Sequence, residues 1–230
     1  MTGLTAVKTL KTISLTILVL VALYFVIDRV LPYFFKFNIE HYKSYYWPNK
    51  WWLVGHLSGG ALALLIGPFQ LSTPFRNRFI KIHRSLGKLY ISGIMIASLS
   101  AFYMSFYVAP QVNVSWSISL FVLALVWLAS VLMAYRAIML KQIPQHREWM
   151  IRSYIISLGF VLFRFLNESS LVQELMPAFE ERGPACLWLS WTVPLFASEM
   201  LLQWNKKKIK NRKRPQSDFD NEPVGYNFKP

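Results

Sequence analysis

Six long apolar stretches dominate this sequence of 230 residues and limit what it can fold into. A helix needs roughly 20 residues to cross the hydrocarbon core of a bilayer. The stretches cover about residues 13–31, 51–71, 86–108, 116–140, 150–166 and 185–204. Because a backbone in lipid must satisfy its own hydrogen bonds, the pattern predicts an all-α fold, a polytopic membrane bundle of about six helices.

The charged residues lie almost wholly between and beyond these stretches. Hydrophobic residues make up 54% of the chain and charged residues only 16%, while the net charge is +14. A strongly basic chain can bind nucleic acid, but this placement of the charges favours the lipid bilayer as partner and not nucleic acid. The single cysteine, Cys186, excludes an internal disulfide and a thiolate metal cluster.

The distribution of Lys and Arg predicts the orientation. Most of the 25 Lys and Arg residues lie in four segments that six crossings place on one side: 1–12, 72–88, 135–152 and 205–230. The richer side faces the cytoplasm, so both termini are expected there, in the inner (plasma) membrane of the cell. Residues 1–204 are then a six-helix transmembrane domain. Residues 205–230 are expected to be a basic, disordered tail on anionic head groups.

The first apolar stretch is expected to be retained. Its basic start also fits a signal peptide, but no small-residue cleavage site follows it. Asp28, Arg29 and the aromatic residues 33–35 instead indicate a collar at the membrane interface.

Three of the four histidines stand at positions that suggest chemistry. His56 lies about one and a half turns inside the outer end of the second stretch, whereas His83 and His146 each precede a stretch on the cytoplasmic side. Each of the latter two is followed by arginine, Arg84 or Arg147, which indicates a weak internal repeat. Two imidazoles from facing helices are what a bis-His haem b requires, and a three-histidine metal centre is excluded because His56 lies on the opposite side.

Simpler interpretations stay open for the same residues. Arg84, Arg147 and Arg152 would hold the haem propionates, but histidines beside such cations also contact lipid head groups. His56 could donate an interhelical hydrogen bond, and the Gly55-x-x-x-Gly59 spacing favours helix packing over a cofactor slot.

Two charges inside the apolar stretches have structural explanations. Glu199 is at a depth where Arg152 or Arg136 could pair with it. Arg164 has Glu168 one turn away, although it could also face an anionic ligand at the outer side.

A set of motifs between about residues 50 and 170 resembles a widespread, uncharacterised bacterial family of multi-pass membrane proteins. The family implies no activity. The resemblance is carried by His56 with Gly59-Gly60, Gly67-Pro68-Phe69-Gln70, Arg76, His83-Arg84 with Gly87 and Tyr90, and His146 with Trp149-Met150-Ile151-Arg152.

The chain also distantly resembles the cytochrome b561-like proteins, six-helix bundles that hold two haems b between their second and fourth and their third and fifth helices. The resemblance implies that His83 and His146 are the third- and fifth-helix pair and that His56 is the second-helix ligand. Residues 116–122 contain neither histidine nor methionine, so the outer haem lacks its fourth-helix ligand.

The sequence therefore predicts a membrane-embedded electron carrier with one haem b between His83 and His146. Its redox partner would be a quinone or another carrier in the membrane, and whether it is an oxidoreductase in its own right stays open. The alternative is a haem-free transporter or scaffold protein on the same bundle.

Overall fold

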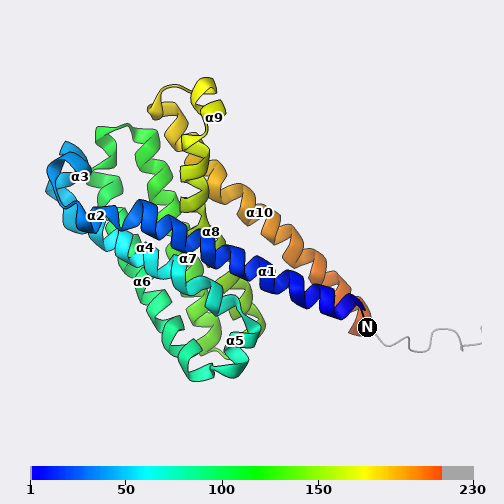
Figure 1. Ribbon diagram of the computed structural model, residues 1–230. Helices are drawn as coiled ribbons and strands as arrows, with labels where there is room; N and C mark the ends of the chain where they lie inside the picture. Colours follow the sequence, from blue (N-terminus) through cyan, green and yellow to red (C-terminus); the bar gives the residue numbers. More distant parts are fainter. Residues whose placement is uncertain (1, 214–230) are drawn as a thin grey trace, which may run out of the picture. The chain divides into compact units, whose positions relative to one another are not determined.

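The computed structural model describes residues 2–213, and all regular structure in that part of the chain is helical (Figure 1). This confirms the predicted polytopic all-α bundle. Within the described residues, six helical stretches are long and apolar enough to cross a membrane: Thr12–Phe35, Trp47–Leu71, Ile80–Gln111, Val114–Met139, Ile143–Glu168 and Phe179–Trp204.

Short helices connect the long ones. In chain order the elements are α1 (Thr2–Phe25), η1 (Val26–Val30), α2 (Pro32–Phe35), α3 (Ile39–Tyr46), η2 (Trp47–Asn49), α4 (Lys50–Leu71), α5 (Thr73–Arg78), α6 (Ile80–Tyr107), η3 (Ala109–Gln111), α7 (Val114–Met139), α8 (Ile143–Glu168), α9 (Ser170–Leu175) and α10 (Phe179–Lys213). We call the end of the bundle with α5 and the α7–α8 turn the α5 end, and the end with α2, α3 and α9 the α3 end (Figure 1).

The chain divides into two units, residues 1–195 and 196–230. Helix α10 continues through Lys213, so helical structure extends into the segment 205–230 that the sequence predicts to be disordered. Lys and Arg, which make up most of residues 205–213, are good helix formers, which explains this extension. Residues 214–230 of the predicted tail lie outside the described residues, and the boundary at residue 204 stays a prediction.

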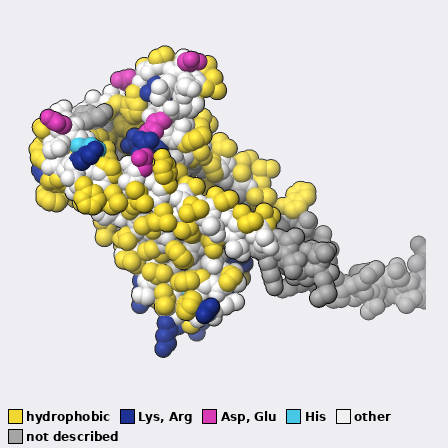
Figure 2. All heavy atoms as spheres, viewed as in Figure 1, with side chains coloured by type: hydrophobic (Ala, Val, Ile, Leu, Met, Phe, Trp, Pro, Cys, Tyr) yellow, Lys and Arg dark blue, Asp and Glu magenta, His cyan; other side chains and the backbone are white. Residues whose placement is uncertain are grey.

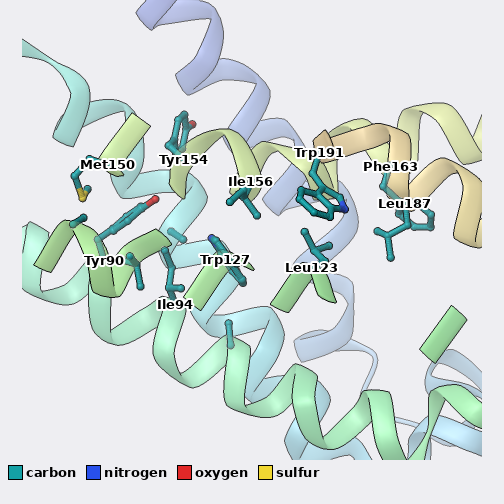
Figure 3. Packing of buried hydrophobic residues seen from close by; sticks show 14 of the residues in the cluster. Tyr90, Ile94, Leu123, Trp127, Met150, Tyr154, Ile156, Phe163, Leu187 and Trp191 are labelled. Atoms are coloured by element: carbon teal, nitrogen blue, oxygen red, sulfur yellow. The ribbon is translucent and has the colours of Figure 1, made fainter. Parts of the chain in front are cut away.

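Helices α4, α6, α7 and α8 form a four-helix core. Each packs against two of the others, in the order α4, α6, α7, α8 and back to α4. Helices α6 and α8 are therefore diagonal partners across the bundle, as are α4 and α7. The apolar interior is filled by large side chains, among them Tyr90, Trp127 and Tyr154 (Figure 3).

Hydrogen bonds between helices cross this interior. The hydroxyl groups of Tyr90 on α6 and Ser153 on α8 lie 2.9 Å apart, and the indole of Trp127 donates to Ser157 at 2.9 Å. Tyr154 donates to the backbone carbonyl of Leu64 on α4 at 3.3 Å. Polar groups in an apolar interior are costly unless they are paired, so these bonds fix which helix faces meet.

Glycines determine how closely α4 approaches α6. A Cβ atom on Gly59 would collide with the backbone carbonyl oxygen of Gly93, and one on Gly55 would come within 2.8 Å of the Ser100 hydroxyl. This confirms that the Gly55-x-x-x-Gly59 motif serves helix packing. A Cβ atom on Gly60 would meet no atom within 4 Å.

The adjacent glycines give a matched test of this packing. We expect Gly59→Ala to lower the free energy of unfolding by about 1–3 kcal/mol, because overpacking forces the two backbones apart. Gly60→Ala is expected to leave it unchanged or raise it by up to about 1 kcal/mol, because alanine favours helix and meets open space. Unfolding by SDS titration in mixed micelles measures both, and equal effects of the two substitutions would contradict the α4–α6 packing.

Candidate functional site

Helix α8 places His146 in its first turn at the α5 end. Lys141 between α7 and α8 has a φ of 58°, in the left-handed region, and Pro144 occupies the first turn of α8. The ring nitrogen Nδ1 of His146 lies 2.8 Å from the carbonyl oxygen of Ala134 on α7. A carbonyl can only accept, so Nδ1 carries the proton and Nε2 keeps a lone pair. Metal-ligating histidines are commonly oriented in this way.

His83 lies in the first turn of α6, at the same end. Its Nδ1 is buried and has no hydrogen-bond partner among the described residues. The structure therefore places the two histidines that the sequence pairs in the first turns of diagonal helices at the same end, and one ring nitrogen of His83 has no partner in the described part of the chain.

The predicted propionate partners differ in their surroundings. Arg84 and Arg147 are exposed. Arg152 stacks over the Trp149 ring, 4.7 Å from its centroid, and forms an ion pair with Glu148 at 3.7 Å. Arg152 is thus already held by an aromatic ring and a carboxylate, and of the three it is the least suited to bind a further anion.

A pocket at the α5 end, lined by residues such as Arg136, Gln145 and Trp149, includes neither His83 nor His146. Two turns deeper than these histidines, the bond between Tyr90 and Ser153 joins α6 to α8 directly. This bond closes the interior between the two helices at that depth, so any group held by both histidines would lie at the helix ends.

A cavity with a volume of about 180 Å³ lies at the α3 end. Its walls are mostly apolar and come from α4, α6, α7, α8 and the first apolar stretch, with residues such as Leu57, Met104, Trp116 and Phe163. Gly60 also lines it, which explains why its Cβ position is empty. A mostly apolar cavity with a few polar groups is the usual form of a small-molecule site.

His56 is one of the few polar residues in this wall. Its Nδ1 lies 3.0 Å from the carbonyl oxygen of Ala97 on α6, so Nδ1 donates and Nε2 is left to accept. The ring is edge-on to Phe160 of α8, with 5.4 Å between the centroids. The predicted interhelical hydrogen bond of His56 is confirmed, although the ring is also open to a ligand.

Two arginines line the same cavity. Arg29 belongs to η1, a single π-helical turn, which is a conformation often found at functional sites. It binds both carboxylate oxygens of Glu168 on α8, at 3.0 and 2.7 Å, and Asp28 at 2.7 Å. Arg164 is 3.9 Å from Glu168, which confirms the predicted i,i+4 pair.

Sequence reasoning missed this cavity. It interpreted Arg29 only as part of an interfacial collar, and its partner Glu168 is 139 residues away in the chain. The only signal was the presence of Arg29, His56 and Arg164 in apolar stretches at one predicted side.

Glu199 accepts a hydrogen bond from Gln203 at 2.7 Å, and its ion pair with Arg152 or Arg136 stays a prediction. Among the described residues, no group of three or more His, Cys, Asp or Glu could hold a metal ion.

The ion pairs at the cavity can be ranked by a double-mutant cycle. We expect a coupling of about 0.5–1 kcal/mol between Arg29→Gln and Glu168→Gln, since both side chains are about 40% exposed and the pair is bidentate. The cycle of Arg164→Gln with Glu168→Gln is the matched control, with a coupling near zero at 3.9 Å. SDS titration gives both values, and a larger coupling for Arg164 would contradict the geometry.

Comparison with known proteins places the chain in a family. No curated protein and no solved structure matches it. The family model described as "Predicted membrane protein (DUF2306)" matches residues 53–202, which include His56, His83 and His146. This confirms the resemblance to an uncharacterised family of multi-pass membrane proteins. The chain belongs to the DUF2306 family of predicted membrane proteins.

Proposed function

We propose that this chain is a membrane-embedded b-type haem electron-transfer protein with one bis-His haem at the α5 end. The observation that carries the proposal is the placement of His83 and His146 in the first turns of diagonal helices, at the same end of the bundle. Diagonal helices can present two imidazoles to opposite faces of one flat cofactor.

The ring nitrogens support the same assignment. Nε2 of His146 has its lone pair available because Nδ1 donates to Ala134, and Nδ1 of His83 is buried without a partner in the described part of the chain. Arg84 and Arg147 are exposed beside the pair and would hold the propionates. A bound haem would supply one-electron redox chemistry. With one haem at one face, the partner is a carrier dissolved in the membrane, such as a quinone.

A difference spectrum tests the proposal. The purified full chain, expressed with haem supplied, is expected to show a low-spin b-type spectrum when reduced with dithionite, with one haem per chain. His83→Ala and His146→Ala should each abolish the low-spin signal, because each removes one axial ligand.

Two other histidines provide the controls. His41 lies on α3 with its ring 4.6 Å from that of Tyr33, so His41→Phe keeps an aromatic ring there and should retain the spectrum. His56→Phe should retain it as well, since His56 lies at the other end of the bundle. A colourless wild-type protein, or a spectrum that depends on His56 alone, would overturn the assignment.

The orientation is part of the proposal. In Figure 2 hydrophobic side chains cover the middle of residues 1–195, both signs of charge gather at the α3 end, and only Lys and Arg are visible at the α5 end. The excess of positive charge supports a cytoplasmic α5 end, with both termini in the cytoplasm of a plasma-membrane protein.

Reporter fusions check this orientation. Green fluorescent protein fused after residue 230 is expected to fluoresce, and alkaline phosphatase at the same position to be inactive, because the phosphatase folds only outside the cytoplasm. Alkaline phosphatase inserted after Lys36, between α2 and α3, should be active. The reverse pattern would place the α5 end outside.

A second candidate function is favoured by the cavity at the α3 end. A haem-free membrane protein that binds or transports a small molecule would use His56, Arg29 and Arg164, which all line that cavity. The same difference spectrum separates the candidates, since this protein would be colourless and would keep its fold without haem.

A further inference from the structure

The two arginines at the cavity differ in how closely a carboxylate pairs with them. Glu168 binds Arg29 through both of its oxygens, at 3.0 and 2.7 Å, and Asp28 also binds Arg29. Arg164 is left with a contact of 3.9 Å to the same carboxylate, and its side chain is 45% exposed. A guanidinium offers five N–H donors in a planar fork that suits carboxylate or phosphate. Arg164 is therefore the cation of the cavity with capacity to bind an anion.

A second polar group lies about one helical turn deeper. Arg164 and Phe160 are one turn apart on α8, and the Phe160 ring touches that of His56. Nε2 of His56 accepts hydrogen bonds, because Nδ1 donates to Ala97. A ligand that reaches both residues would carry an anionic group and, a few bonds away, a hydroxyl donor.

The rest of the cavity suits an apolar chain. Leu57, Leu120 and Phe163 contribute to its walls, and Gly60 leaves space beside them. The volume of about 180 Å³ slightly exceeds that of an apolar cavity of about 150 Å³ that accommodates benzene. This is space for one short alkyl chain.

We propose that this cavity binds a single-chain amphiphile with an anionic head group on Arg164 and a hydroxyl near that head on His56. The apolar chain fills the space beside Gly60. Because the carboxylate of Glu168 is bound by Arg29, that carboxylate does not neutralise Arg164. This site lies at the opposite end of the bundle from the histidine pair, and the inference does not rest on haem binding.

Native mass spectrometry of the full chain in an uncharged maltoside detergent tests the site with four probes. β-Hydroxydecanoate is expected to bind one per chain, decanoate more weakly because it lacks the hydroxyl, and decanol at least about ten-fold more weakly because it lacks the charge. Decyl phosphate compared with decanoate tells whether the head group is a phosphate or a carboxylate, and tighter binding of either one than of decanol supports the site.

Three variants locate the binding. Arg164→Gln should weaken decanoate binding about ten-fold, and Gly60→Phe should abolish it by filling open space. His56→Phe should remove only the advantage of β-hydroxydecanoate over decanoate. Lys36→Gln is the control, since it removes an exposed cation at the same end that does not line the cavity.

Two results would overturn the proposal. If decanol bound as tightly as decanoate, the ligand would not need an anionic head group. If binding were unchanged in both Arg164→Gln and Gly60→Phe, the ligand would not occupy this cavity. Thermal unfolding of each variant without ligand shows whether it is folded. Because no measurement here involves haem, failure of this site and failure of the haem proposal are separate results.

Discussion

The contact of the α4 and α6 backbones at Gly59 and Gly93 determines the arrangement around it. A side chain on Gly59 would strike the Gly93 carbonyl, so the two helices can approach this closely only because both positions lack one. Without a hydrophobic force between helices in lipid, such close packing is a main source of association. Once this face of α4 is committed to α6, the neighbouring residue Gly60 points elsewhere and leaves a space. The same packing therefore both closes one side of α4 and opens the cavity on another.

Hydrogen bonds between polar side chains also determine how the core helices pack. The Tyr90 and Ser153 hydroxyls join the diagonal helices α6 and α8, and Trp127 donates to Ser157 beside them. These bonds satisfy buried polar groups and join the helices in the interior. The two candidate sites in residues 1–195, the histidine pair and the cavity, lie at the two ends of the bundle.

The long apolar stretches made the fold predictable from the sequence, because only helices of that length satisfy their backbone in lipid. The helices exceed the predicted spans: α6 begins at Ile80 and α8 at Ile143, so His83 and His146 are in first turns. That these two histidines lie at the same end of the bundle followed from their matching context. The cavity did not, because the sequence cannot tell which side of α4 faces α6, so Gly59 and Gly60 look equivalent. The partner of Arg29 could not be found either, because it depends on how η1 meets the end of α8.

The two candidate sites lie at opposite ends of the bundle and are oriented by different helices. His146 is oriented by Ala134 of α7, whereas His56 is oriented by Ala97 of α6, so the two sites share no hydrogen-bond partner. Effects of substitutions at distant sites without shared partners usually add. An influence of one site on the other would therefore require a movement of α6, α7 or α8, the helices that contribute to both. The bond between Tyr90 and Ser153 joins two of these helices, so it opposes a relative movement of α6 and α8.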